Sequence, residues 1–192
     1  MRILPISLYS IYNKLDEREE IELLNNCSSL THGHEISKLG CKIYTDYIKK
    51  ILTGKDKKEA FYEIINKDYS NYYSTNSIDK YKRLLNPEFV NLNVSQIKSS
   101  GYIVDTLEAS IWCILNTTSY EEAVVKAINL GEDTDTIGAI TGPLAGIIYG
   151  SERIPQRWTS KLKNKEYLTN LIDNYTETLS NKIQNSKINN TK

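Results

Sequence analysis

The sequence predicts an all-α protein, and two observations lead to that class. Between Ile36 and Leu52, apolar residues recur at the 3.6-residue period of a helix for more than four turns. Elsewhere in the 192 residues we find neither an internal repeat nor a convincing pair of alternating segments that would predict paired strands. The length suits one domain with its own apolar core.

The expected helices follow one another along the chain. The first apolar stripe ends at Gly54, and a second helix is predicted over Lys58–Asn66. Residues Lys67–Asn93 are polar, rich in tyrosine and weakly periodic, which predicts a long connection with one short helix near Ile78–Leu85. Helical periodicity returns over Asp105–Leu115.

Two further helices flank a glycine. Ser119 and Glu122 match a capping box, which opens a helix that runs to about Leu130. After Gly131 and the polar residues that follow it comes a helix with glycines at positions 138, 142, 146 and 150. That spacing places the glycines on nearly one face, where another helix can approach closely. Glycine and the mid-helix Pro143 cost about 1 and about 3 kcal/mol of helix propensity, so we expect this helix in the middle of the fold.

Composition excludes several classes of function. Lys plus Arg and Asp plus Glu both number 24, and no basic block argues for a nucleic-acid partner. The three cysteines form neither a CxxC motif nor a disulfide framework, which indicates reduced thiols in a cytoplasmic protein. The stretch MRILPISLY has neither the continuous apolar region nor the small-residue cleavage site of a secretory signal, so we expect none there. The longest apolar run, 137–149, is shorter than the roughly 20 residues of a membrane span. Residues 179–192 are expected to form a polar, disordered tail.

The segment GEDTDTIGAITG, residues 131–142, carries the chemistry. One aspartate before a helix is most often an N-cap, and one in the first turn suits the helix dipole. Asp133 and Asp135 together with two threonines exceed what a cap needs. Because hard divalent cations prefer oxygen ligands, we interpret Asp133, Asp135 and Thr136 as ligands of Mg²⁺, Mn²⁺ or Ca²⁺.

Two alternatives for this segment fail. An EF-hand loop that starts at Asp133 needs an oxygen ligand at its fifth position and glutamate at its twelfth, where this chain has Ile137 and Leu144. A phosphatase with an aspartate nucleophile needs DxDx[TV] after an apolar strand, whereas these aspartates follow a helix end and a glycine turn.

The order of several motifs resembles a known family. The stretch Gly101–Gly150, with its GEDTDTIGA run, resembles the C-terminal signature of the ADP-ribosylglycohydrolases, the ADP-ribosylhydrolases of the dinitrogenase-reductase-activating type. SSLTHGHEISKLG resembles a second block with Thr-His at a helix start, and MRILPISLY resembles a Met-Arg-x-x-Pro block. RIPQRW and the following helix resemble the end of the family's domain.

The resemblance implies a compact, orthogonal bundle of helices with a two-metal Mg²⁺ site, in which Mn²⁺ can replace Mg²⁺. It implies hydrolysis of the glycosidic bond between ADP-ribose and a protein side chain or a small acceptor, with the metal orienting the distal ribose and polarising water. The catalytic group itself remains unknown. Carried over by position, the metal ligands are Asp133, Asp135 and Thr136, and the substrate-binding residues are His32, Gly101 and Tyr102.

Structural roles compete with some of these assignments. A histidine at a helix start is often a cap, and we place His32 in the cleft because the Thr-His block matches. For Tyr102 the competing role is packing in the core. Trp112 is interpreted as a core residue, and Asp105 as a helix cap.

The resemblance covers the C-terminal two-thirds of the family's domain, which we expect to span residues 1–178. Relatives carry a Gly-Asp-x-x-Gly block and a Thr-Asp-Asp motif before their Met-Arg block, and this chain contains no Asp-Asp pair. We therefore expect helices to be missing and the Gly138–Gly150 face to lie open. Three hypotheses remain: one half of a split hydrolase completed by a separate N-terminal polypeptide, an inactive remnant, and a module that binds ADP-ribose or a related nucleotide.

Overall fold

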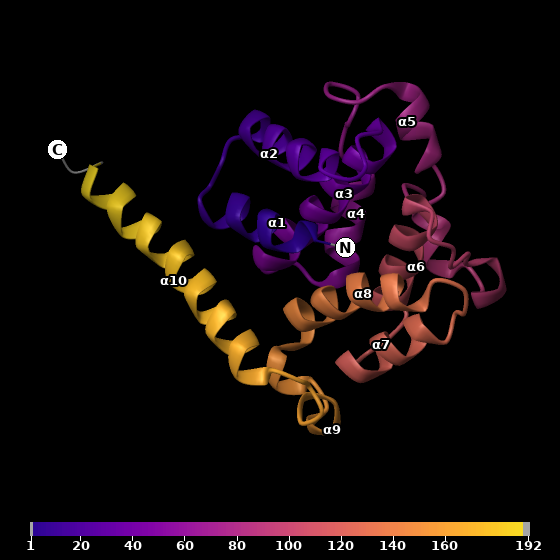
Figure 1. The fold of residues 1–192 in the computed structure, drawn as a ribbon. Coiled ribbons are helices and arrows are strands. Elements are labelled where there is room, and N and C mark those ends of the chain that lie inside the picture. Colours follow the sequence, from indigo (N-terminus) through magenta and orange to yellow (C-terminus); the bar gives the residue numbers. More distant parts are fainter. Residues whose placement is uncertain (1, 190–192) are drawn as a thin grey trace.

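The computed structural model describes residues 2–189, with residues 180–189 described by their backbone only. Within that range the chain forms helices and no strand, which confirms the all-α class (Figure 1). The α-helices are α1 (Ile3–Tyr12), α2 (Glu17–Ser29), α3 (Glu35–Leu52), α4 (Lys57–Ile65), α5 (Thr75–Lys80), α6 (Ile103–Leu115), α7 (Tyr120–Ile128), α8 (Thr134–Tyr149), α9 (Gln156–Thr159) and α10 (Lys165–Asn189). Three 3-10 helices are η1 (Pro87–Asn91), η2 (Val94–Gln96) and η3 (Ser151–Arg153).

Helix α3 lies at the centre of the molecule. It contacts α1, α2, α4, α5, α6 and α8. The apolar stripe that predicted this helix is its buried side, where Leu39, Ile43 and Tyr47 are fully buried. Burial of a large apolar side chain contributes about 1.5–3 kcal/mol, so this stripe supplies much of the core.

Helix α8 packs between α6 and α7, and its glycine face is covered. A Cβ built on Gly138 lies 3.2 Å from Ile128 Cγ2, and one built on Gly142 lies 3.5 Å from the Tyr120 hydroxyl oxygen. Ile128 and Tyr120 both belong to α7. The expectation that this face lies open is therefore wrong, because α7 is the helix for which the glycines make room.

Most predicted helices are confirmed to within a few residues, but two local details differ. The short helix after residue 67 is α5, which begins at Thr75 because the Ser74 hydroxyl accepts the N–H of Ser77. At α7 the Ser119 hydroxyl accepts the N–H of Glu122, while the Glu122 carboxylate accepts the N–H of Thr118 at 2.7 Å. In a capping box the Glu122 carboxylate would accept the N–H of Ser119, and here it accepts the N–H of the preceding residue, Thr118.

A buried ammonium group ties three helices together. Lys42 of α3 is 1 % exposed, and its Nζ lies 2.8 Å from Oε1 of Glu20 on α2. Nζ also donates to Asp46, one turn further along α3. The Glu20 carboxylate in turn accepts from the Ser10 hydroxyl of α1 at 3.2 Å. Because a buried charge needs partners on every side, this cluster specifies how α1, α2 and α3 sit together.

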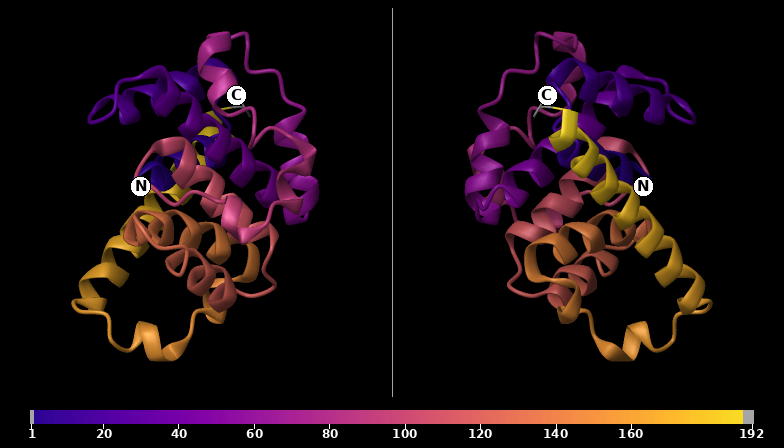
Figure 2. Two further views of the ribbon diagram at one scale, coloured as in Figure 1. Left: turned by 90° about the vertical axis from the view of Figure 1, so that its right-hand side faces the viewer. Right: turned by 90° about the vertical axis from the view of Figure 1, so that its left-hand side faces the viewer.

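Helix α10 lies apart from the other helices along most of its length (Figure 2). It contacts α1, where the Tyr175 hydroxyl donates to the carbonyl of Pro5. Leu168, Leu171 and Ile172 remain exposed on the same helix. The helix extends through Asn189, and residues 190–192 of the expected tail lie outside the described residues, so the disordered tail stays a prediction. No described helix combines the length and apolar character that crossing a membrane requires.

Lys42→Met should lower the free energy of unfolding by about 3–5 kcal/mol, because it leaves two buried carboxylates without their main cation. Lys49→Met is the matched control, since Lys49 also contacts Glu20 but its side chain is 40 % exposed, so solvent screens its charge and the expected loss is about 1 kcal/mol. Urea denaturation of both variants measures the difference. Equal losses would show that the buried position of Lys42 is not what stabilises the cluster.

The same cluster predicts a loss of stability in acid. Burial alone raises the pKa of Glu20, but the hydrogen bonds and charges of Lys42 and, to a smaller extent, Lys49 outweigh burial, and the pKa is lowered below its ordinary 4.5. A carboxyl with a lowered pKa in the folded state stabilises that state above its unfolded pKa and loses this contribution as pH falls. The melting temperature should therefore fall below about pH 4.5, and in Glu20→Gln it should depend less on pH in this range.

Candidate functional site

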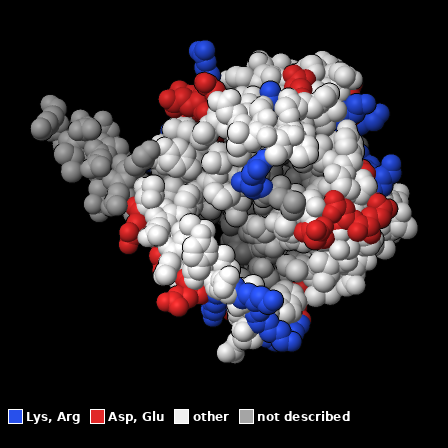
Figure 3. Space-filling model, in the orientation of Figure 1, with Lys and Arg blue, Asp and Glu red and all other residues white. Residues whose placement is uncertain are grey.

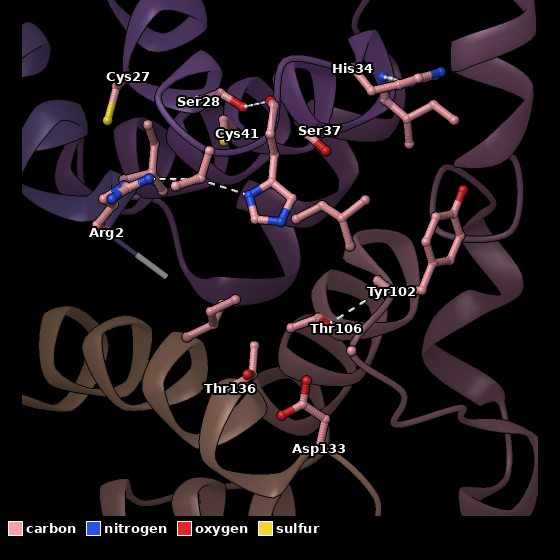
Figure 4. Close-up of a pocket in the computed structure, with 17 residues that line it drawn as sticks. Arg2, Cys27, Ser28, His34, Ser37, Cys41, Tyr102, Thr106, Asp133 and Thr136 are labelled. Carbon is pink, nitrogen blue, oxygen red and sulfur yellow. Dashed lines mark hydrogen bonds between the residues drawn. The ribbon is translucent and has the colours of Figure 1, made fainter.

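A cavity of about 550 Å³ opens between two walls of helices. One wall is formed by the start of α1, the end of α2 and the start of α3, and the other by the starts of α6 and α8 (Figure 4). The molecule is hollowed on the face shown in Figure 3, and acidic and basic side chains gather at separate places around that hollow. The volume lies within the range of small-molecule binding sites.

The segment before α6 is hydrogen-bonded to the turn before α8. The N–H of Asp133 donates to the carbonyl of Ser99 at 3.0 Å, and the Ser99 hydroxyl donates to the carbonyl of Leu130 at 3.2 Å. The Ser100 hydroxyl donates to Asp105 at 2.6 Å. We expected Asp105 to cap α6, and this expectation is wrong, because the N-cap position is occupied by Tyr102. Asp105 instead binds the loop that precedes the helix.

Two residues with left-handed backbone directly precede Asp133. Gly131 has φ +90° and Glu132 has φ +50°, a conformation that favours glycine at the first position. Gly101 faces Asp133 from the other segment, and a Cβ built on Gly101 would lie 2.6 Å from Asp133 Oδ2. Only glycine at position 101 leaves the carboxylate this room.

The carboxylates of the turn have different surroundings. Asp133 is half-buried and lines the cavity, and the Thr136 hydroxyl lines it beside Asp133. Contacts with the Thr136 hydroxyl first, and with Asp135 second, hold the pKa of Asp133 below its ordinary value. Asp135 is exposed and is not among the residues that line the cavity, and its carboxylate accepts the N–H of Thr136 at 2.8 Å.

The opposite wall carries the basic side chains of the cavity. The Arg2 guanidinium donates to the Thr31 hydroxyl, which also lies 2.9 Å from His32 Nδ1. His34 is the cap of α3, because its Nδ1 accepts the N–H of Ile36 at 3.2 Å. The cap role that competed for His32 is thus taken by its neighbour.

The structure brings five of the six sequence-predicted site residues to one cavity. His32, Gly101 and Tyr102 line it together with Asp133 and Thr136, and Asp135 stays outside the lining. Tyr102 is 47 % exposed, so core packing does not explain it. Trp112 is buried in the core, as predicted, and its Nε1 donates to the carbonyl of Leu92 at 3.0 Å.

Sequence reasoning missed several lining residues. They include Arg2, Ser28 and Cys41. Arg2 lies in the Met-Arg block and Ser28 in the Thr-His block, whereas Cys41 follows the second block directly. Membership of a block does not show which of its side chains face the cavity. Burial raises the pKa of the Cys41 thiol, so a reactive thiolate is disfavoured there.

The oxygen ligands of the turn are of the type that a hard cation binds, but they are too few for two cations. Two carboxylates and one hydroxyl are the oxygen ligands that Mg²⁺ accepts, and Mg²⁺ keeps several waters. Two Mg²⁺ ions carry four positive charges, against two negative charges here, so this turn by itself suits one ion. Among the described residues, no group of three or more His, Cys, Asp or Glu side chains is placed to hold a metal ion.

Comparison with known proteins places the chain in a family. The family model described as ADP-ribosylglycohydrolase matches residues 1–187. An ADP-ribosylarginine hydrolase of Pseudomonas putida is 30% identical over 145 residues, which cover 75% of this chain and 36% of that protein. The ADP-ribosyl-[dinitrogen reductase] glycohydrolase of Rhodospirillum rubrum is 28% identical over 165 residues, covering 86% of this chain and 50% of that protein.

A solved structure described as an ADP-ribosylglycohydrolase-related protein complex has the same fold, with a TM-score of 0.65 at 23% identity. The match covers 83% of this chain and 53% of that one. The chain therefore spans about half, or less, of the length of these similar proteins.

Gly101→Ala tests the close approach at the cavity floor. The added methyl group must displace the Asp133 carboxylate, so Mg²⁺ or Mn²⁺ should bind more weakly in a calorimetric titration. Gly33→Ala is the matched control, because a Cβ at Gly33 meets no atom within 4 Å. Cation binding that is the same in both variants would contradict the role given to Gly101.

Proposed function

Because the chain belongs to the ADP-ribosylglycohydrolase family, we propose that its cavity binds the ADP-ribose part of ADP-ribosylated proteins or of small ADP-ribose conjugates. The reaction that we propose is hydrolysis of the glycosidic bond between that ADP-ribose and its acceptor. The observation that supports this proposal best is the convergence of His32, Gly101 and Tyr102 with Asp133 and Thr136 on one cavity.

The residues of the turn hold the reacting end of the ligand in this proposal. The lowered pKa of Asp133 favours its carboxylate form, which accepts hydrogen bonds from ribose hydroxyls or ligates a cation. Gly101 lets the ligand approach this carboxylate without a side chain between them. Tyr102 lies at the cavity mouth, where its exposed ring offers a stacking surface for a base.

The proposal includes a cation site with Mg²⁺ or Mn²⁺ held by Asp133, Asp135 and Thr136. A bound Mg²⁺ supplies Lewis-acid polarisation of a water or of ribose oxygens. Asp135 contributes to this set if its side chain turns from the N–H of Thr136 toward the cavity.

We propose further that a second cation needs carboxylates beyond this turn, and that a separate polypeptide supplies them. The support is the charge count given above, in which two carboxylates neutralise only half the charge of a cation pair.

The three free thiols support a reducing, cytoplasmic location.

Recognition without cleavage is the second candidate function. It is favoured by the position of Asp135, which lies outside the cavity lining while Asp133 lies within it. In that function the cavity binds ADP-ribose and the turn positions the distal ribose.

The test measures release of free ADP-ribose from an ADP-ribosylarginine peptide by chromatography, with Mg²⁺ present. We expect no release by the chain alone. We expect release after addition of the half of the Rhodospirillum rubrum relative that this chain does not match. Asp133→Asn should then lower the rate about 10²-fold or more, because it removes a charged group at the reacting end.

Asp173→Asn on α10 is the control, since this carboxylate is exposed and belongs to no proposed site. Binding of ADP-ribose with no release in any mixture would support recognition alone. Neither binding nor release would overturn the proposed function.

A further inference from the structure

Asp105 lies in the first turn of α6, but its carboxylate bonds the loop in front of that helix. Its Oδ2 accepts the Ser100 hydroxyl at 2.6 Å, and the oxygen of that hydroxyl accepts the N–H of Tyr102 at 3.2 Å. Asp105 is half-buried and is not among the residues that line the cavity. It therefore acts on the loop and not on a molecule bound in the cavity.

The next residue of α6 bonds the same loop. The Thr106 hydroxyl lies 3.1 Å from the carbonyl oxygen of Ser100 and 3.1 Å from that of Tyr102, and Figure 4 draws its bond to Tyr102. A hydroxyl has one hydrogen, so Thr106 donates to one of these carbonyls at a time. The residues of α6 from Thr106 to Leu115 are all buried, so Asp105 and Thr106 attach the loop to the core.

The loop in turn contacts Asp133 on both sides of Ser100. The Ser99 carbonyl accepts the N–H of Asp133 at 3.0 Å. Gly101 faces the Asp133 carboxylate so closely that a Cβ built on it would lie 2.6 Å from Oδ2. A displacement of Ser100 would therefore move both of the groups that Asp133 meets.

We propose that Asp105 is a positioning residue, which through Ser100 determines where the Asp133 carboxylate lies. The inference rests on the proposed function, in which Asp133 ligates a cation, and it adds a residue that touches neither cation nor substrate. Mutation of a residue that orients a metal ligand typically lowers metal affinity by about 10- to 100-fold. The competing explanation is the negative charge of Asp105 alone, which attracts a cation at any loop position.

Calorimetric titration with Mn²⁺ separates the two explanations. Asp105→Ala should weaken Mn²⁺ binding by about 10-fold, because Ser100 loses its partner on α6. Asp105→Asn removes the charge but keeps an oxygen that accepts the Ser100 hydroxyl, so its affinity should stay within about twofold of the wild type. Ser100→Ala breaks the same bond from the other side. The double variant Ser100→Ala with Asp105→Ala should therefore lose little more affinity than either single variant.

Amide hydrogen exchange measures the loop directly. The N–H of Asp133 is bonded to the Ser99 carbonyl, so it should exchange faster in Asp105→Ala and at the wild-type rate in Asp105→Asn. Asp16→Ala is the matched control, because Asp16 also lies at a helix start but accepts the N–H of Glu19 at 2.8 Å as a cap of α2. This control should lower the melting temperature and leave Mn²⁺ affinity unchanged, since Asp16 lies outside the cavity lining.

Equal losses of Mn²⁺ affinity in Asp105→Asn and Asp105→Ala would overturn the inference, because the charge alone would then explain the effect. Wild-type affinity in Asp105→Ala would also overturn it and leave the proposed function standing. No Mn²⁺ binding by the wild type would overturn the proposed cation site and this inference together. If Asp105→Ala fails to fold, Ser100→Ala carries the same prediction, because it removes the same hydrogen bond.

Discussion

The central position of α3 is the constraint on which the rest of the structure depends. This helix contacts six others, so its buried stripe organises the core, and its buried Lys42 requires carboxylates from α2 and from α3 itself. The same helix reaches the cavity through its first turns, where Ser37 and Cys41 line the wall. Core and site are therefore connected, because the packing that fixes α3 also fixes one wall of the cavity.

The second wall depends on short-range backbone geometry. A left-handed turn at Gly131 and Glu132, a hydrogen bond from Asp133 to Ser99, and the absence of a side chain at Gly101 place one carboxylate at the cavity floor. The two walls differ in charge, with Arg2 on one and Asp133 on the other. This difference in charge supports the proposed function, since ADP-ribose combines charged phosphates with neutral sugars.

Sequence reasoning was most reliable where one local signal decides the structure. The apolar stripe of α3, the stop at Gly54 and the chain break at Gly131 were all predicted, because each depends on residues close in sequence. It failed where distant segments meet. That α7 covers the glycine face, or that Arg2 lies across a cavity from Asp133, depends on tertiary packing that no local pattern records. The capping box at Asp16 and Glu19, with the acidic first turn of α2, is a local signal that also marks a helix start.

In the proposed function, ADP-ribose binds between the start of α8 and the end of α2. A heteronuclear NMR titration of the ¹⁵N-labelled chain with ADP-ribose and Mg²⁺ tests it directly, because amide shifts report which residues meet the ligand. We expect the amides of Thr31, Gly101 and Thr136 to shift together with a single affinity, and those of α4, which contributes no residue to the cavity lining, to stay unchanged. Shifts confined to α4 or α10, or no shifts at saturating ligand, would contradict it.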